Sequence, residues 1–112
     1  EATFAKAHIA SYEQQLGSSN FNKELYGNGP VTRPGVKYTI IEGRYDDTVV
    51  PFTNAFLHEP GVKNILVQDP CRNDHASHVN FTYDVNVYQM AVNALDPDHA
   101  QPVTCVPQPF IG

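Results

Sequence analysis

The chain has 112 residues, one domain's worth at most, and its formal charge of −5 reflects 12 acidic against 7 basic side chains. This acidic balance argues against a nucleic-acid-binding surface, because such surfaces concentrate Lys and Arg. With 41% hydrophobic and 17% charged residues the chain should bury a core, while no stretch approaches the roughly 18 apolar residues of a membrane span.

The first part of the chain is predicted to be helical. Residues 2–16 carry apolar side chains on one stripe at helical spacing, namely Ala5, Ile9, Tyr12 and Leu16. Gly17 would end this helix, and Ser19 would cap a short second helix that ends at Gly27. The glycines and prolines of residues 27–35 then indicate an irregular connection.

Two short segments further on have the composition of strands. Residues 36–42 and 62–67 are rich in β-branched and other apolar side chains. A polar loop over residues 43–50 and a helix with Pro51 in its first turn would connect them. A long polar loop over residues 68–80 would follow the second strand.

The last predicted helix begins after Asp84, a residue type that caps helices. Its apolar stripe should face the core and consists of Val85, Tyr88, Val92 and Leu95. Asp96 and Pro97 end the helix, and the tail from Gln101 is predicted to be a loop. Strands that alternate with helices predict an α/β fold with parallel strands and crossover helices. Because two strands do not make a stable sheet alone, we expect residues 1–112 to form a single partial domain with an incomplete sheet.

The two cysteines, Cys71 and Cys105, leave two interpretations open. Both lie in loop-like sequence, which favours a disulfide, and closing such a loop would stabilise the fold by about 4 kcal/mol in the chain-entropy model. Two free, buried thiols are the alternative. Neither cysteine belongs to a Cys-x-x-Cys metal or redox pattern.

Polar residues that can carry chemistry follow each predicted strand. The loop after residues 36–42 contains Asp46 and Asp47, and the loop after the second strand contains His75 and His78, together with further acids. The carboxyl ends of parallel strands share one edge of a sheet, where functional sites form. There, a carboxylate could hold the Nδ1 proton of a histidine, which would then act as a general base. The alternative is that polar loops commonly contain Asp and His without any catalytic role.

A pattern across the chain sharpens this prediction. A predicted strand ends at Gly43, Asp46 follows three residues later, and a short apolar step ends at Pro51. Further matching segments span residues 38–51, 64–71, 78–84 and 93–100. In order and spacing, these segments resemble the C-terminal part of secreted α/β-hydrolase lipases of the actinobacterial and fungal class 2 type. The resemblance covers most of residues 14–105.

The resemblance implies a role for several residues. Asp46 would be the acid and His78 the base of a Ser–Asp–His triad, whereas Asp47 stands one position late. Cys71 and Cys105 would form the disulfide of the family. The implied activity is hydrolysis of carboxylic esters, including lipids, by a secreted enzyme that needs no cofactor and no metal.

The nucleophilic serine is not expected within these residues. α/β-Hydrolases present it in a Gly-x-Ser-x-Gly elbow between a strand and a helix, and the triad follows the order Ser, acid, His. The serines at positions 11, 18, 19 and 77 do not fit this elbow. We therefore expect the nucleophile and the oxyanion hole on a missing N-terminal part of the hydrolase, and this chain alone to be inactive.

Two other interpretations compete with a hydrolase. A metal half-site from His75 and His78 would need three or four ligands, and no partner motif accompanies the two histidines. A non-catalytic segment derived from a hydrolase could instead bind a partner through its unfinished sheet edge. A sequon for N-glycosylation at Asn80 matters only if the source is eukaryotic and that side chain is exposed.

Overall fold

The computed structural model of the protein describes residues 9–27 and 29–112. The chain divides into two compact units, with the boundary between Val36 and Lys37. Residues 2–8 of the first predicted helix lie outside the described part. The expectation that residues 1–112 form a single partial domain stays a prediction.

The first unit contains two short helices, α2 over Ala10–Gln15 and α3 over Asn20–Tyr26. The predicted cap of the second helix is confirmed, because Ser19 Oγ accepts a hydrogen bond from the Asn22 backbone N–H at 3.1 Å. Gly27 ends α3 with a φ of +56°, a conformation that favours glycine. Neither helix buries a residue, so the core of the protein lies in the second unit.

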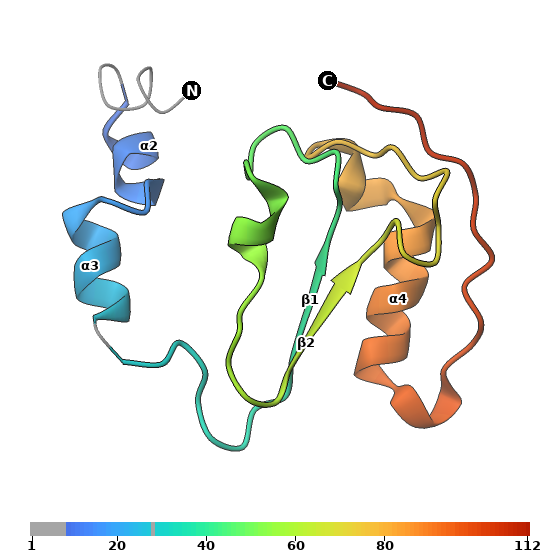
Figure 1. The fold of residues 1–112 in the computed structure, drawn as a ribbon, viewed down its shortest axis with the longest axis horizontal. Helices are drawn as coiled ribbons and strands as arrows, with labels where there is room; N and C mark the ends of the chain where they lie inside the picture. Colours follow the sequence, from blue (N-terminus) through green and yellow to red (C-terminus); the bar gives the residue numbers. More distant parts are fainter. Residues whose placement is uncertain (1–8, 28) are drawn as a thin grey trace. The chain divides into compact units, whose positions relative to one another are not determined.

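The second unit is built on a parallel pair of strands, β1 over Tyr38–Glu42 and β2 over Val62–Leu66 (Figure 1). Tyr38 pairs with Val62 at one end and Glu42 with Leu66 at the other. Both strand predictions and their parallel direction are confirmed, and the fold is mixed α/β. Because the strands are parallel, the loops after Glu42 and Leu66 leave the same edge of the sheet.

The connection between the strands differs from the predicted helix. A single 3₁₀ turn, η1 over Phe52–Ala55, follows Pro51, which is itself extended with a ψ of 151°. The chain then remains extended because the Asn64 side chain on β2 holds the Leu57 backbone. Asn64 Nδ2 donates to Leu57 O at 2.8 Å, and Asn64 Oδ1 accepts from Leu57 N at 3.3 Å. These two bonds replace the backbone hydrogen bonds that a longer helix would form.

The last helix, α4 over Val85–Leu95, begins at the predicted cap, where Asp84 Oδ1 accepts the Asn86 N–H at 2.8 Å. The prediction of its buried stripe is wrong. All four residues of that stripe are 38–87% exposed: Val85, Tyr88, Val92 and Leu95. The helix instead buries Asn86 and Met90. A buried asparagine is tolerated here because both hydrogens of its amide and its amide oxygen form hydrogen bonds.

The core lies between the sheet, α4 and the C-terminal tail. Val67, Cys71 and Met90 are its buried members, and the partly buried side chains packed on them are Ile41, Ile65, Phe81, Val87, Val103 and Cys105. Cys71 and Cys105 form a disulfide, as predicted. Beyond α4 the tail turns back and runs along the helix in the opposite direction (Figure 1). The disulfide therefore joins the loop after β2 to the tail.

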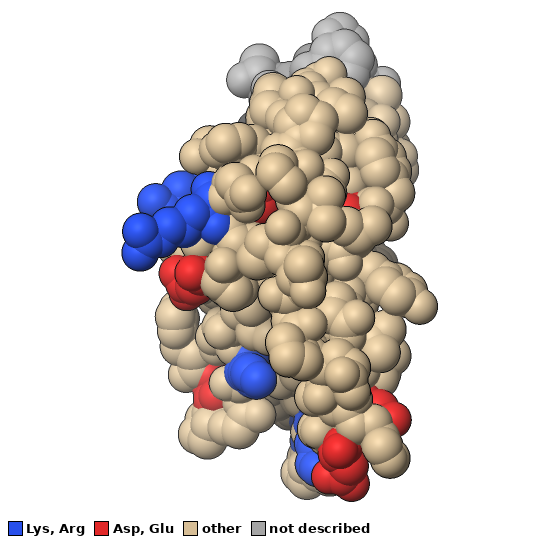
Figure 2. Space-filling model, turned by 90° about the vertical axis from the view of Figure 1, so that its right-hand side faces the viewer, with Lys and Arg blue, Asp and Glu red and all other residues tan. Residues whose placement is uncertain are grey.

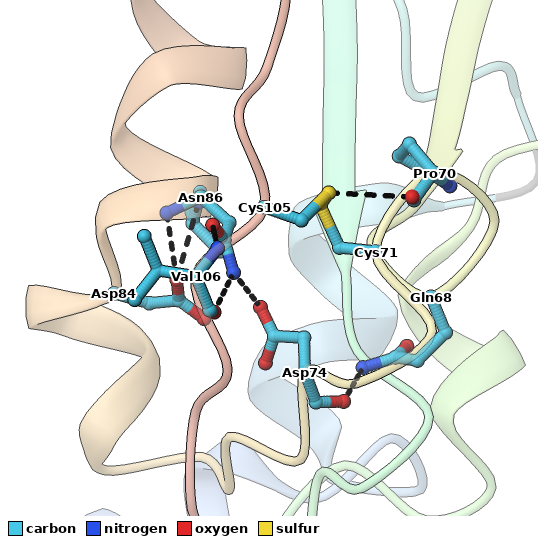
Figure 3. The surroundings of a disulfide bond; sticks show 9 residues. Gln68, Pro70, Cys71, Asp74, Asp84, Asn86, Cys105 and Val106 are labelled. Atoms are coloured by element: carbon cyan, nitrogen blue, oxygen red, sulfur yellow. Dashed lines mark hydrogen bonds between the residues drawn. A yellow bond between two sulfur atoms is a disulfide. The ribbon is translucent and has the colours of Figure 1, made fainter.

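A buried polar network lies beside this disulfide (Figure 3). The Asn86 amide nitrogen donates to Asp74 Oδ2 and to Val106 O, both at 2.8 Å, and Asn86 Oδ1 accepts from Val106 N at 2.8 Å. Gln68 Nε2 donates to Asp74 O at 2.9 Å. The predicted polar loop over residues 68–80 is thus irregular, but it is tied to α4 and to the tail.

The Asp84 carboxyl is a second acid in this network. Asp74 and Asp84 are 0% and 1% exposed, and Asp84 Oδ2 has no hydrogen-bond partner within the described part of the chain. Burial, reinforced by the neighbouring Asp74 carboxyl, raises the pKa of Asp84 to about 6. The folded protein therefore holds this proton more tightly than the unfolded chain, whose Asp has a pKa of about 3.9.

We expect the free energy of unfolding to fall as the pH rises from 4 to 6, because Asp84 loses its proton in that range. The contribution of Asp84 to the free energy of unfolding is complete below its pKa in the unfolded chain and is lost above its pKa in the folded protein. Its size is on the order of 3 kcal/mol. Asp84→Asn keeps a capping side chain and an amide donor, so it should remove the contribution of Asp84 and make this slope smaller. Urea unfolding at pH 4 and pH 7 measures the effect, with Asp96→Asn as an exposed control.

The surface around α4 and the tail is poor in charge. Figure 2 shows this side as mostly uncharged, with the charged side chains toward its left edge and its lower end. Large apolar side chains are exposed there, including Tyr88 and Leu95 on α4 and Phe110 and Ile111 in the tail. None of the helices described in residues 9–27 and 29–112 is long and apolar enough to span a membrane.

Candidate active site

Asp46 lies in the loop that follows β1 and is held there by its own backbone. Its N–H donates to Gly43 O at 3.2 Å, which closes a tight turn at the end of the strand. Its Oδ1 accepts the N–H groups of Thr48 and Val49 at 2.8 and 2.7 Å. These bonds fix the plane of the carboxylate and leave Oδ2 pointing to another partner.

That partner is His78, in the loop that follows β2. The His78 Nδ1 atom lies 2.9 Å from Asp46 Oδ2. The neighbouring Asp47 accepts the His78 backbone N–H through Oδ1 at 3.2 Å. One acid therefore holds the imidazole and the next holds the backbone, so the structure brings together the two residues that the sequence paired.

The exposure of the two side chains differs in a way that suits proton transfer. The Asp46 side chain is 6% exposed and that of His78 is 46% exposed. With Nδ1–H donated to Asp46, the lone pair of the imidazole is on Nε2. This nitrogen forms no hydrogen bond with any described residue, and it is therefore available to take a proton from a nucleophile.

The loop that carries His78 is anchored on its buried side. Asn80 Oδ1 accepts from the Ser77 backbone N–H at 2.6 Å and from Ser77 Oγ at 2.7 Å, and Ser77 Oγ also contacts Ile111 O. Asn80 Nδ2 donates to Pro109 O at 2.9 Å. The amide of the sequon is thus buried and bonded, which excludes a glycan on Asn80 in this fold.

The electrostatics favour an ionised acid beside a basic histidine. Burial opposes ionisation of Asp46, but the hydrogen bonds from His78, Val49 and Thr48 outweigh it and lower the pKa of the Asp46 carboxyl. The hydrogen bond to Asp46 raises the pKa of His78 above its usual value, against a smaller opposing effect of desolvation. Asp46 is therefore a carboxylate at neutral pH, and it stabilises the imidazolium form of His78.

We expect Asp46→Asn to lower the pKa of His78 by about one unit or more, because the variant removes the hydrogen-bonded charge. An NMR titration of the His78 Cε1–H group in the chain measures this shift. Asp96→Asn is the matched control, since Asp96 also bonds a histidine, His99, at 3.0 Å on an exposed surface. An unchanged His78 titration in Asp46→Asn would contradict the pair.

The other polar residues of the two loops do not join the pair. His75 contacts Tyr45 edge to face, with the ring centroids 4.8 Å apart. Asp74 is buried in the network beside the disulfide. Among the residues that the structure describes, no group of three or more His, Cys, Asp or Glu side chains could hold a metal ion.

Glu42 is a residue near the site that no sequence motif indicated. It ends β1, is 6% exposed, and its carboxyl lies within hydrogen-bonding reach of the Asp46 carboxyl. Its only sequence signal is a charged residue at the end of an otherwise apolar strand, directly before a glycine. Charged strand-end residues are commonly exposed, so this signal did not indicate burial.

Two comparisons with known proteins found no match. No protein-family model matches the sequence. No curated protein matches it either. The chemistry of the chain is therefore inferred from its own residues.

Proposed function

We propose that this chain supplies the acid and the base of a Ser–Asp–His triad in a carboxylic ester hydrolase of the lipase or esterase type. The observation that carries the proposal is the 2.9 Å contact between Asp46 Oδ2 and His78 Nδ1, with Nε2 left open. The two residues come from consecutive loops at the carboxyl edge of a parallel sheet, where α/β enzymes hold their sites. The resemblance to the C-terminal part of class 2 lipases supports the same roles.

In this reaction Nε2 of His78 takes the proton of a serine hydroxyl while the serine oxygen attacks the ester carbonyl carbon. The tetrahedral intermediate expels the alcohol, which receives that proton from the His78 imidazolium, and an acyl-serine remains. His78 then takes a proton from water as the water oxygen attacks the acyl group. The acid is released, and the proton returns to the serine. Asp46 stays ionised throughout and stabilises the imidazolium.

The serine would come from sequence outside these residues. Ser77 is 1% exposed and its hydroxyl is bonded to Asn80, so it cannot reach a substrate. The Ser19 hydroxyl caps α3 and donates to Gln14 O at 2.7 Å. The N-terminal part of the hydrolase, including the nucleophile elbow and the oxyanion hole, is therefore the proposed partner of this chain.

The proposed site of action is extracellular, with an ester or lipid as substrate and no cofactor. The disulfide between Cys71 and Cys105 supports this location, because disulfides persist in oxidising compartments. Several apolar side chains that follow His78 in the chain are exposed, namely Val79, Tyr83 and Tyr88. They suit a lipid-like substrate or the missing part of the hydrolase.

A second candidate function is partner binding without catalysis. The two strands form the whole sheet among the described residues, so both strands have an unpaired edge. The exposed apolar face of α4 adds surface that another chain could cover. This candidate requires no nucleophile, and one experiment separates it from the first.

Native protein that contains this sequence should be treated with a fluorophosphonate probe, and its intact mass taken without reduction. We expect the probe to label a serine on a second polypeptide that accompanies residues 1–112, or on sequence that precedes them in the same polypeptide. The label should be absent when the protein is unfolded before treatment, since the probe reacts with an activated serine. An unlabelled chain that purifies with a different protein would favour partner binding instead.

A further inference from the structure

Glu42 occupies an unusual position for a glutamate, because it ends β1 with only 6% exposure. Its carbonyl oxygen accepts the Val67 N–H at 3.0 Å, which anchors the backbone to the neighbouring strand. Its Oε1 accepts the Gly43 N–H at 2.7 Å. One N–H donor is too little to compensate a buried carboxylate, so the group needs another partner or its proton.

The turn after β1 provides that partner. The hydrogen bond from Asp46 N to Gly43 O folds the loop back over the strand end, so the Asp46 and Glu42 carboxyls lie within hydrogen-bonding reach of each other. Gly43 permits this close fold because a Cβ at its position would lie 3.0 Å from the Phe81 ring. The loop thus places the Glu42 carboxyl behind the Asp46 carboxyl, with His78 on the solvent-exposed side of Asp46.

The two carboxyls are not equivalent. Asp46 accepts three N–H donors, from Thr48, Val49 and the His78 imidazole, whereas Glu42 accepts one. Two adjacent carboxylates do not ionise together without a large cost, so they share one proton. Because Asp46 accepts more hydrogen bonds than Glu42, the negative charge is more stable on Asp46, and Glu42 keeps the shared proton. The pKa directions agree: burial and the neighbouring Asp46 raise the pKa of Glu42, and hydrogen bonds lower that of Asp46.

We propose that Glu42 is a positioning residue, a neutral carboxylic acid that donates its hydrogen bond to Asp46 and completes a chain from Glu42 through Asp46 to His78. The inference rests on the proposed function, in which Asp46 orients His78. The bond from Glu42 holds the Asp46 carboxylate against rotation on its buried side. As a neutral group, Glu42 also adds no second negative charge to the surroundings of the imidazole, which keeps His78 a base near neutral pH.

The charged groups around the pair determine how it can be tested. Asp46 faces Glu42 from the same loop, His78 faces both from the loop after β2, and Asp47 adds its charge near His78. A titration of His78 therefore reports the charge of Glu42. Glu42→Gln is the informative variant, since its amide is uncharged and can still donate to Asp46 and accept from Gly43.

The experiment is an NMR titration of His78 in the chain with Glu42→Gln, Glu42→Leu and Asp46→Asn. If Glu42 is neutral, Glu42→Gln shifts the pKa of His78 by less than about 0.3 units, while Asp46→Asn shifts it several times as far. A fall of about one unit in Glu42→Gln would overturn the proposal, because it would show that Glu42 carries a charge. An unaltered pKa in Asp46→Asn would instead overturn the acid–base pair, and with it the proposed function.

The positioning role has its own measurement, namely the exchange of the His78 Nδ1–H proton with water. We expect this proton to exchange about as slowly in Glu42→Gln as in the natural sequence, and at least tenfold faster in Glu42→Leu, which lacks the donor to Asp46. Equal protection in Glu42→Leu and Glu42→Gln would show that Glu42 does not position Asp46. If Glu42→Leu does not fold, faster exchange in Glu42→Gln would overturn the role, and unchanged exchange would support it.

Discussion

His78→Ala, introduced into the protein that contains both this chain and the nucleophile, should reduce kcat/KM for a simple ester roughly 10⁴-fold. The reason is that Nε2 of His78 is the only proposed acceptor for the serine proton, and the Asp46 contact at 2.9 Å keeps the opposite nitrogen protonated. The loss is measured as the rate of ester hydrolysis at substrate concentrations well below KM. The rate of fluorophosphonate labelling gives a second measure.

The chain contains a matched control for this substitution. His99 Nδ1 also lies 3.0 Å from an aspartate, Asp96, but both side chains are highly exposed near the end of α4. His99→Ala should therefore leave kcat/KM within about twofold of the natural value, as expected for an exposed pair of little energetic weight. Equal activity of His78→Ala and His99→Ala would exclude a catalytic role for His78.

The same site predicts the direction of the pH dependence. The hydrogen bond to Asp46 raises the pKa of His78, so the neutral base is reached at a higher pH than for a free histidine. The activity should rise with pH through this raised pKa. Because the folded state holds the imidazolium proton more tightly, the contribution of His78 to stability is present below the unfolded pKa and is lost as the pH passes the folded one.

Local patterns in the sequence predicted several features of the fold correctly. The strand compositions located β1 and β2, and the residue types Ser19 and Asp84 located the starts of α3 and α4. These signals are local, because a cap or a β-branched run acts within a few residues. The contact of Asp46 with His78 followed from the strands being parallel, which brings the two loops to one edge.

Features that depend on long-range contacts were not predictable in the same way. The buried face of α4 was assigned to its apolar stripe, but Asn86 is buried because the tail residue Val106 and the loop residue Asp74 bond its amide. Likewise, Asn64 holds the segment after η1 extended, against the helix that Pro51 suggested. Side-chain hydrogen bonds over such separations leave no periodic signal in the sequence.

Replacement of both cysteines, as Cys71→Ala with Cys105→Ala, should lower the free energy of unfolding by about 4 kcal/mol, given the 34-residue separation of the pair. Such a loss is a large part of the stability of a typical domain. The effect should concentrate in the tail, because the disulfide holds its start against the loop after β2. Urea unfolding of the double variant, with and without a reductant, measures the difference.

The tail carries this change to the site. His75 N donates to Gln108 O at 2.9 Å and Asn80 Nδ2 donates to Pro109 O at 2.9 Å, so the tail bonds the chain on both sides of His78. In the double variant the His75 amide should therefore lose protection from hydrogen exchange at least as strongly as the helix α4. Activity should also fall, since a displacement of about 1 Å at a catalytic group can reduce the rate roughly 100-fold.

The double variant should be insensitive to reductant, whereas the natural chain should respond to it. Equal stability of the natural chain before and after reduction would show that the hydrogen bonds of the tail hold the His78 loop without the disulfide.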